Sequence, residues 1–528
     1  MTDSDLIPDE TFDYVIVGAG SAGCVLANRL TANPSIRVLL LEAGGSDKRQ
    51  EITIPAAFSK LFKSEADWNY QTTPQPGLAG RSIYWPRGKV LGGSSSLNAM
   101  MWVIGFAADY DRWAELAGPA WSWSSLQPLF DGTLIPVEEQ RDPRPHTRSL
   151  LEGFQQAGYA LEDANLAEPD GFTLTRVTQH RGARVNANQA YLRPIAGRKN
   201  LEVRTGARAT RVRFEGTRAT GVDYRHGGRM RSVIARAEVI LAGGAVNTPQ
   251  LLLLSGIGDP KELKKHGIPV VAASPEVGRN MRDHLVSLLV KQSDPGTLFS
   301  AESPAQIANY LFRRRGMLTS NVAETYGFVR SDPSLATPDL EIIGAPASYV
   351  KEGLAGIPGH GISLGPILLQ PESRGTVTLR TSDPFEAPII DPGYFTDPDG
   401  RDRERMLAGL EICDRIFATV ALRSRTTDHY VAPEGSEKLS PTERWLFALE
   451  QLSHTLYHPT STARMGSDES SVVDSQLRVR GVSGLRVADA SVMPEIVRGH
   501  THAPATVIGE KAAQLITDTA PAQLAPRS

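Results

Sequence analysis

Residues 12–45 read FDYVIVGAGSAGCVLANRLTANPSIRVLLLEAGG, and this stretch decides the fold. A short apolar strand, Asp13–Val17, leads directly into the glycine-rich turn Gly18–Gly23. An amphipathic helical segment follows, and a second apolar strand, Arg37–Leu41, is closed by Glu42. This order of strand, glycines, helix and strand is typical of the βαβ unit that binds a dinucleotide.

The three glycines and the acidic residue each have a mechanical role in such a unit. Gly18 permits the tight turn, Gly20 lets a pyrophosphate approach the backbone, and Gly23 lets the helix lie close to the strand. The N-terminus of the helix offers unpaired N–H groups to the phosphates. Glu42 follows Gly23 by 19 residues, where its carboxylate can accept hydrogen bonds from an adenosine ribose. The stretch therefore predicts dinucleotide binding, with NAD and FAD as alternatives.

Composition and charge narrow the class of protein. Of the 528 residues, 41% are hydrophobic and 22% are charged, which is ordinary for a globular protein. A net charge of −3 gives no basic surface for nucleic acid. The two cysteines, Cys24 and Cys413, allow neither a disulfide framework nor a cysteine-based zinc site, and they suit a reducing compartment.

The sequence also bears on the relation to membranes. The first residues, MTDSDLIPDE, are acidic and polar, unlike a secretory signal. No apolar run reaches the roughly 18 residues of a membrane-spanning helix. We therefore expect a cytoplasmic protein without a transmembrane segment, and a peripheral contact with the inner membrane stays open.

Strand patterns occur in two blocks that flank a different middle part. The middle part, 293–453, contains alternating segments typical of antiparallel strands. In the first block we expect a meander of strands attached to the first sheet, followed by a helix with Thr248 as N-cap and Pro249 at its first position. The predicted elements are strands at 201–204, 209–214, 219–225, 232–241, 361–369, 375–380 and 484–490, and helices at 250–254, 401–419 and 503–517.

Six further blocks of the chain combine glycine, asparagine, proline or histidine in specific patterns: Arg87–Met100, Gly244–Gly258, Val277–His284, Gln370–Gly375, Tyr457–Gly466 and Gly499–Pro504. With these blocks, the sequence resembles the glucose–methanol–choline (GMC) family of FAD-dependent oxidoreductases over nearly its whole length. It is most similar to the bacterial choline-, sorbose- and alcohol-dehydrogenase-like members. The resemblance implies that the cofactor is FAD.

The expected fold class is α/β with an α+β part. A Rossmann-like FAD-binding domain, discontinuous in sequence, is expected over residues 10–135, 196–290 and 455–520. A substrate-binding domain built on an antiparallel sheet is expected over 136–195 and 291–454. The resemblance assigns these residues to FAD binding: Gly18, Ala19, Gly20, Ser21, Ala22, Gly23, Glu42, Ala43, Trp68, Arg87, Val90, Gly92, Gly93, Ser94, Asn98, Ala99, Met100, Ala209, Ala242, Gly243, Asp489, Ala490, His502, Ala503 and Thr506.

The resemblance also assigns the catalytic residues. In the oxidation of an alcohol, the flavin accepts a hydride at N5. The protein must supply a base for the hydroxyl proton and a fixed geometry for the transfer. His458 and His502 match the catalytic pair of the family, with His458 as the principal base and His502 holding the alkoxide or sharing the proton. A histidine suits this role because its ordinary pKa of about 6.5 leaves it largely neutral at pH 7. Glu324 and Tyr457 are expected on the substrate side.

The remaining histidines have simpler interpretations. His284, His454 and His500 are expected to be solvated or structural. His454 and His458 have the four-residue spacing of a zinc pair on a helix. Pro459 disfavours helix at this point, and no carboxylate ligand motif accompanies the two histidines. We therefore expect no metal site.

Three departures from the family pattern have consequences. Leu97 stands where some members carry a histidine that bonds FAD covalently, so we expect non-covalent FAD. Ile104–Gly105 replaces an Arg–Gly pair near the flavin or the substrate entrance. The segment 131–150 is shorter than usual and borders the entrance in the family, which predicts unusual substrate access.

The resemblance implies an FAD-dependent alcohol dehydrogenase or oxidase. It would oxidise the CH–OH group of a small alcohol to an aldehyde or ketone and pass the electrons to a quinone or dye-type carrier or to O2. Two alternatives are a flavin-containing lyase or photodecarboxylase of the same fold, and a flavoprotein without catalysis. Retention of both His458 and His502 favours oxidation, because the lyases and the photodecarboxylase tend to lose or replace this pair.

Overall fold

The computed structural model describes residues 10–519. Residues 1–9 lie outside the described residues and contain most of the acidic N-terminal stretch. Residue 520, the last residue of the expected FAD-binding segment 455–520, also lies outside them.

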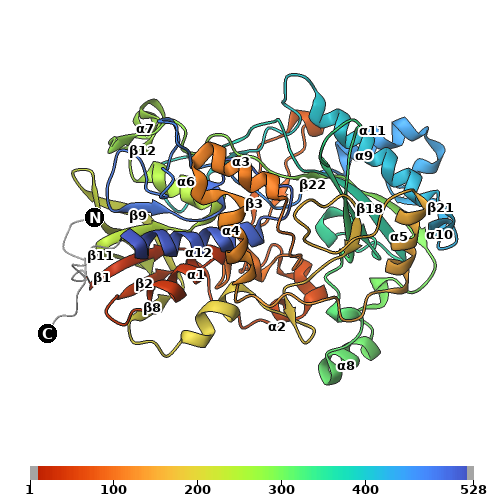
Figure 1. Cartoon of the computed structure of the whole chain (residues 1–528), viewed down its shortest axis with the longest axis horizontal. Coiled ribbons are helices and arrows are strands. Elements are labelled where there is room, and N and C mark those ends of the chain that lie inside the picture. The colour runs from red at the N-terminus through yellow and green to blue at the C-terminus, as the bar shows by residue number, and fades with distance from the viewer. Residues whose placement is uncertain (1–9, 520–528) are drawn as a thin grey trace.

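A seven-stranded sheet forms one half of the molecule, on the left in Figure 1. Its order is β8-β2-β1-β11-β10-β9, and β23 pairs with the C-terminal end of β11. The strands β8, β2, β1, β11 and β23 are parallel to their neighbours in this group, whereas β9 and β10 form an antiparallel meander with β11. Their bounds are β1 Glu10–Val17, β2 Val38–Leu41, β8 Leu201–Arg204, β9 Ala207–Glu215, β10 Arg218–His226, β11 Arg229–Leu241 and β23 Leu485–Val487.

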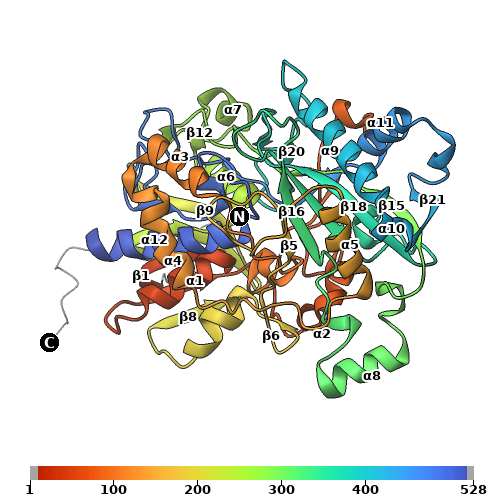
Figure 2. The same ribbon diagram turned by 45° about the vertical axis from the view of Figure 1, so that its right-hand side comes forward.

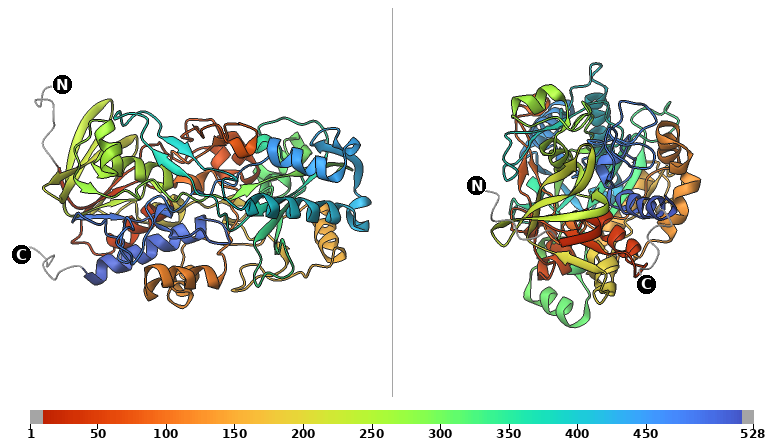
Figure 3. Two further views of the ribbon diagram at one scale, coloured as in Figure 1. Left: turned by 90° about the horizontal axis from the view of Figure 1, so that it is seen from above. Right: turned by 90° about the vertical axis from the view of Figure 1, so that its left-hand side faces the viewer.

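The central strands are nearly continuous apolar runs because both faces of this sheet are covered. In β1 and β2 the side chains of Val15, Ile16 and Leu39 are fully buried. The helices α1 (Ser21–Leu30) and α12 (His502–Thr519) pack against each other. Figure 3 shows the long α12 lying along this half of the molecule. The predicted βαβ unit and the attached meander are confirmed.

The contact between α1 and α12 joins an N-terminal helix to a C-terminal helix of the described residues. Arg29 and Glu510 form an ion pair of 2.7 Å between the helices. A Cβ atom at Gly509 would lie 2.8 Å from the Cα atom of Ala22, so the glycine allows the close approach. The N-terminal glycine turn and the C-terminal histidine block are therefore brought to the same part of the molecule.

An eight-stranded antiparallel sheet forms the other half, and α9 (Arg401–Phe417) packs on its strand β18. Figure 2 shows this half turned toward the viewer. The order is β21-β15-β18-β17-β16-β5, with β14 pairing both β18 and β22. The bounds are β5 Phe172–Leu174, β14 Leu285–Val286, β15 Leu289–Ser293, β16 Thr325–Val329, β17 Leu340–Ala345, β18 Gly361–Leu368, β21 Thr426–Ala432 and β22 His454–Thr455.

The pairing of β14 with β22 forms the junction between the two halves. Leu285 and Thr455 are partners in this ladder, so the segment that leaves the first half lies beside the segment that returns to it. After the first half of the molecule, the chain re-enters the second sheet at Leu285, slightly before the boundary expected at residue 290. On the other side of the division, the backbone carbonyl of Tyr191, in the segment expected in the second domain, accepts a hydrogen bond of 2.7 Å from Asn28 of α1.

The helix expected from residue 250 begins earlier. It is α6, Gly244–Leu254, so the prediction of Thr248 as N-cap and Pro249 as first residue is wrong. The Thr248 hydroxyl accepts a hydrogen bond from the N–H of Gly243 and donates one to Asp489. A buried carboxylate from a distant segment thus completes the first turn, and a local pattern could not show that.

The remaining elements are short or peripheral. The predicted strand 375–380 is β19, Thr376–Thr378, which pairs with β20 in a separate two-stranded sheet. None of the helices in residues 10–519 is long and apolar enough to cross a membrane. The other bounds are α2 Gln50–Thr53, α3 Ala107–Ala117, α4 Trp123–Asp131, α5 Pro145–Gln156, α7 Pro260–Lys265, α8 Pro304–Arg313, α10 Val420–Arg423, α11 Pro441–Gln451, β3 Tyr70–Gln71, β4 Tyr84–Trp85, β6 Gln179–His180, β7 Ala183–Arg184, β12 Ile257–Gly258, β13 Ala272–Ala273 and β20 Ile389–Asp391.

Candidate active site

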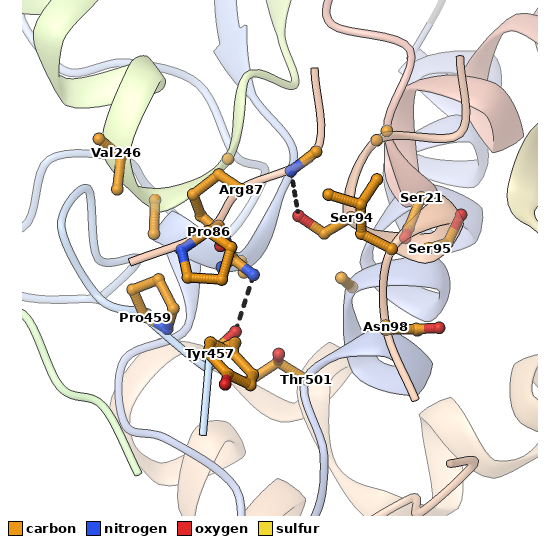
Figure 4. A pocket seen from close by; sticks show the side chains of 18 of the residues that line it. Ser21, Pro86, Arg87, Ser94, Ser95, Asn98, Val246, Tyr457, Pro459 and Thr501 are labelled. Atoms are coloured by element: carbon orange, nitrogen blue, oxygen red, sulfur yellow. Dashed lines mark hydrogen bonds between the residues drawn. The ribbon is translucent and has the colours of Figure 1, made fainter. Parts of the chain in front are cut away.

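A cavity of about 310 Å³ reaches both the glycine-rich turn and the C-terminal histidines. Gly18, Gly20 and Ser21 line it, and so do His458 and His502. Figure 4 shows Ser21, Asn98 and Tyr457 around this space. A volume of this size is within the range of cofactor and ligand pockets. One cavity therefore joins the dinucleotide motif to the expected catalytic pair.

The turn has the geometry that its sequence predicts. Gly18 has φ of +104°, and a Cβ atom there would lie 2.4 Å from the Ala242 carbonyl oxygen. A Cβ atom at Gly23 would lie 1.9 Å from the Gly18 carbonyl oxygen, so the helix can approach the strand only with glycine. At Gly20 nothing lies within 4 Å of such an atom. The space beside Gly20 is therefore open to a ligand that lies against the backbone, as a pyrophosphate does.

Glu42 lines the cavity at the end of β2 and is buried. Its carboxylate accepts hydrogen bonds from the N–H groups of Ala19 (2.9 Å) and Gly44 (2.8 Å). Burial raises the pKa of Glu42 to about 7, and the two backbone donors partly oppose this shift. Glu42 thus holds the glycine turn in place, and its contact with a ribose stays a prediction.

The first of the six sequence blocks, Arg87–Met100, packs over the glycine-rich turn. Gly92 donates a hydrogen bond of 2.8 Å to the Ala19 carbonyl, and a Cβ atom at Gly93 would lie 2.7 Å from the Gly20 Cα atom. Arg87 donates to the carbonyl of Tyr457 (2.8 Å), as the dashed line in Figure 4 shows. The block therefore connects the dinucleotide turn to the segment that carries His458.

Most residues assigned to FAD line this cavity. Those that line it are Gly18, Gly20, Ser21, Ala22, Glu42, Ala43, Trp68, Arg87, Gly93, Ser94, Asn98, Ala99, Ala209, Ala242, Gly243, Asp489, Ala490 and His502. Those outside the lining are Ala19, Gly23, Val90, Gly92, Met100, Ala503 and Thr506. Several of the latter support the lining from behind, as when the Thr506 hydroxyl donates to the carbonyl of His502 (2.9 Å).

The tautomer of His458 follows from its neighbours. Its Nδ1 lies 3.0 Å from Nδ1 of His284, and Nε2 of His284 lies 3.1 Å from the Leu369 carbonyl oxygen. A carbonyl only accepts, so Nε2 of His284 carries that ring's proton and Nδ1 of His284 is the acceptor. Nδ1 of His458 must then be the donor. The remaining nitrogen of His458, Nε2, is left with a free lone pair, as a general base requires.

The environment of His458 keeps the ring neutral. Burial first, and then the nearby rings of His500 and His284 and the Arg87 cation, hold the pKa of His458 well below its usual range. The ring of His500 lies 4.8 Å from that of His458. The backbone N–H of His458 donates to Asp283 (2.8 Å), which fixes the segment.

His502 is held in the opposite tautomer. The side-chain oxygen of Asn98, Oδ1, accepts hydrogen bonds from Nη1 of Arg184 (2.7 Å) and from the backbone N–H of Met100 (3.0 Å). The side-chain nitrogen of Asn98, Nδ2, therefore faces Nδ1 of His502 at 3.3 Å. Nδ1 of His502 is therefore an acceptor, and the proton is on Nε2. Nε2 is buried and has no hydrogen-bond partner within the described part of the chain.

Burial, followed by the Arg184 cation, lowers the pKa of His502 to about 4. Two neutral imidazoles thus line one cavity, with an accepting nitrogen on His458 and a donating N–H on His502. Such a pair can take a proton from a hydroxyl and donate a hydrogen bond to the oxygen that is left.

The histidines expected to be solvated or structural belong to this centre. His284, His454 and His500 are all buried, and His454 and His500 line the cavity. Nε2 of His500 contacts the buried carboxylate of Glu341 at 3.1 Å. Of the two expected roles, solvated or structural, burial excludes the solvated one for all three. The blocks ending in Asp283–His284 and containing His500 were the available signal, but their contacts with His458 depend on the tertiary fold.

Sequence reasoning also missed Arg184, whose guanidinium is buried and reaches the catalytic region through Asn98. Burial lowers the pKa of Arg184 to about 9, so it is still a cation at neutral pH. Arg184 lies outside the six sequence blocks, and no local pattern indicated a role for it.

Glu324 is outside the cavity lining, whereas Tyr457 is part of it. The Glu324 carboxylate is fully buried and accepts hydrogen bonds from the Ser320 and Thr147 hydroxyls and from the N–H of Arg144 (2.7 Å). The hydrogen bonds of its carboxylate are thus made within the chain, and its expected role on the substrate side stays a prediction.

Of the three departures from the family pattern, only Leu97 lines the cavity. Ile104 is buried in the hydrophobic core of the first half and does not line the cavity. None of the described residues 131–150 lines it either. Leu97 does line it and packs against Ile52 and Leu61. Within residues 10–519 no three His, Cys, Asp or Glu side chains are grouped as metal ligands, and His454 lies in a strand.

The profiles of one family match most of the chain. The N-terminal profile, "GMC oxidoreductase", matches residues 12–286, and the C-terminal profile of the same description matches residues 371–509. The chain belongs to the GMC oxidoreductase family. It is therefore a flavoprotein oxidoreductase with FAD as its cofactor, as the sequence predicted.

Individual relatives agree with this assignment. The chain is 54% identical to an uncharacterised GMC-type oxidoreductase of Mycobacterium tuberculosis, over 96% of this chain and 99% of the relative. It is 40% identical to the alcohol dehydrogenase [acceptor] of Pseudomonas putida, over 96% and 95% of the two chains. A solved structure of Aspergillus oryzae formate oxidase, described for the effect of a mutation on FAD modification, superimposes with a TM-score of 0.90 at 28% identity, over 98% of this chain and 99% of that one. The GMC oxidoreductase fold is thus present over nearly the whole chain.

Proposed function

We propose that this GMC oxidoreductase oxidises the CH–OH group of an alcohol to an aldehyde or ketone. The observation that carries the proposal is the pair of neutral imidazoles with opposite tautomers at one cavity. FAD, when bound, supplies the acceptor for the hydride at flavin N5. The chain itself must remove the hydroxyl proton and hold the oxygen in place.

His458 is proposed as the general base. Its Nε2 lone pair accepts the hydroxyl proton, and His284 holds the ring in the required tautomer through Nδ1. The lowered pKa ensures that this lone pair is not already protonated at neutral pH. A positioned base of this kind contributes about 10²–10⁴-fold to the rate.

His502 is proposed to stabilise the alkoxide. Its Nε2–H has no partner in the described residues and so can donate to the oxygen that loses its proton. The relay from Arg184 through Asn98 maintains this donor without placing a charge on the ring. Donors arranged in advance around a developing negative charge are among the largest contributors to catalysis.

The lining beside Tyr457 is aromatic and aliphatic. It contains Phe58, Phe62, Tyr349 and Leu456, together with other apolar side chains. The carboxylates that line the cavity, Glu42 and Asp489, instead accept hydrogen bonds at the glycine turn and at the start of α6. Because this part of the lining offers a cation no carboxylate partner, we favour an apolar alcohol over a cationic one.

We propose that FAD is bound without a covalent bond. Leu97, at the position that carries the linking histidine in some relatives, is a buried aliphatic side chain and cannot form such a bond. The electrons are proposed to pass to a quinone or dye-type carrier or to O2.

The test is anaerobic reduction of the purified flavoprotein by a panel of alcohols. Bleaching of the flavin band at about 450 nm by apolar alcohols is the expected result. Re-oxidation by air is then compared with re-oxidation by a quinone or dye, which separates an oxidase from a dehydrogenase. If no alcohol bleached the band, the proposal would be refuted and a lyase or photodecarboxylase of the same fold would be favoured.

A further inference from the structure

The helix α8 exposes its apolar side to solvent. Its sequence is PAQIANYLFR, and Ile307, Leu311 and Phe312 are exposed to 40%, 59% and 87%. Ile307 and Leu311 are four residues apart and Phe312 adjoins them, so the three lie on one side of the helix together with Pro304 and Ala308. Surface helices of globular proteins normally place this stripe against the core.

The side of α8 that faces the protein is the more polar one. Tyr310 is buried there and packs with Ile54, Ala56 and Met317. Gln306, on the same side, accepts a hydrogen bond of 3.1 Å from the N–H of Met317. The apolar stripe is therefore not a core face that is partly open, because the helix has its core contact on the opposite side.

Positive charge lies at the C-terminal end of the helix. No acidic residue occurs in α8, and Arg313, Arg314 and Arg315 are consecutive at its C-terminal end. Arg313 and Arg314 are exposed, and the guanidinium of Arg314 lies 4.7 Å from the centre of the Tyr310 ring. Arg315 is paired with Asp142 (2.9 Å). Exposed leucine and phenylalanine beside basic residues are the features of helices that lie in the interface of anionic membranes.

The shape of the surface argues against a second copy of the chain as the partner. A helix of this length is about 15 Å long, and a stripe about 10 Å wide on it covers roughly 150 Å². A stable protein interface buries about 800 Å² on each partner. In Figures 1 and 2, α8 stands away from the body of the molecule at the lower edge, so little flat surface adjoins it. A projecting helix suits insertion into a lipid surface.

We propose that α8 docks the protein on an anionic lipid bilayer, with Ile307, Leu311 and Phe312 in the headgroup region and Arg313 and Arg314 against the lipid phosphates. This contact would be peripheral and reversible, since one short helix provides the apolar area.

The position of α8 relates this contact to the cavity. Tyr310 packs against Ile54 and Ala56, and the 3₁₀ segment Pro55–Leu61 carries Phe58, which lines the cavity. Docking would thus hold the substrate end of the cavity close to the lipid surface, where an apolar alcohol or a membrane quinone is dissolved. This consequence, unlike the docking itself, rests on the proposed function.

The test is co-sedimentation of the FAD-loaded protein with vesicles of phosphatidylcholine, with and without roughly one third phosphatidylglycerol. The wild type is expected to sediment with the anionic vesicles and to be released at high salt. The double variant Leu311→Gln, Phe312→Gln is expected to bind about tenfold more weakly or worse, because two exposed apolar side chains are removed. The control is Val420→Gln in α10, which removes an apolar side chain whose exposed fraction (77%) lies between those of Leu311 and Phe312, and it should bind like the wild type.

Three outcomes would overturn the proposal. The wild type could stay in the supernatant, or the double variant could sediment as the wild type does. Light scattering could instead show a wild-type dimer that the double variant dissociates, which would make a second copy the partner. The flavin absorbance of each variant verifies folding, and vesicle binding requires no turnover, so a failure of the proposed oxidation would leave this result unaffected.

Discussion

The substitution Asn98→Asp tests the assignment of the His502 tautomer. Asn98 now donates to Nδ1 of His502 at 3.3 Å and accepts from Arg184 at 2.7 Å. An aspartate has nearly the same shape and keeps the contact with Arg184, but its second oxygen can only accept. Nδ1 of His502 would then carry the proton, and Nε2 would lose the N–H that is proposed to donate to the alkoxide.

The expected loss is that of one donor to a developing oxyanion. Removing such a donor costs about 10²–10³-fold in kcat, or about 3–4 kcal/mol of transition-state stabilisation. The new carboxylate also favours the imidazolium and raises the pKa of His502 from its present value of about 4. Protonation restores N–H groups on both ring nitrogens. The deficit should therefore be large at high pH and shrink as the pH falls through the raised pKa.

The assay is the rate of flavin reduction by the alcohol under anaerobic single-turnover conditions, for wild type and variant. The pH is varied from about 5.5 to 9, a range that includes the ordinary pKa of histidine. Flavin absorbance confirms that FAD is retained. A deficit of the same size at every pH would indicate a structural role for Asn98, and an unchanged kcat would refute the tautomer argument altogether.

Three further predictions follow from the site. His458→Ala should lower the rate of flavin reduction by about 10²–10⁴-fold with FAD still bound, and a fully active variant would show that another group is the base. In the wild type, kcat/KM should stay constant from neutral pH down past about 6.5, because the base is active when neutral and its pKa is depressed; a decline centred at 6.5 or above would contradict the burial of His458. Gly23→Ala should destabilise the apoprotein, since its Cβ would lie 1.9 Å from a carbonyl oxygen, whereas Gly20→Ala should leave the melting temperature of the apoprotein unchanged and weaken FAD binding; equal thermal losses in the two would refute this distinction.

The first sheet was predictable because its signals are local. The apolar runs of β1 and β2, the glycines between them and the acidic residue after β2 are contiguous in the chain. Glycine roles could be assigned in advance, since a positive φ at Gly18 and a close contact at Gly23 are consequences of a short turn. The helix at Gly244 was placed too late because its first turn is completed by Asp489, which is 245 residues away.

In the candidate site, the sequence predicted which residues are present but not where their side chains point. The identity of His458 and His502 followed from the resemblance of two sequence blocks. Glu324 was also taken from a block, yet its carboxylate is satisfied by Ser320, Thr147 and Arg144. A block specifies that a residue type is present, whereas the direction of its side chain depends on which other segments reach it.

By itself, therefore, the sequence determined the dinucleotide-binding unit, the family, the cofactor and the two candidate catalytic histidines. Only the tertiary structure decided what each histidine can do. Either nitrogen of a neutral histidine ring can carry the proton until a neighbour donates or accepts, and the deciding neighbours are His284 and Asn98, 174 and 404 residues away. Burial by both halves of the fold then keeps both rings neutral, so that one can accept a proton and the other can donate a hydrogen bond.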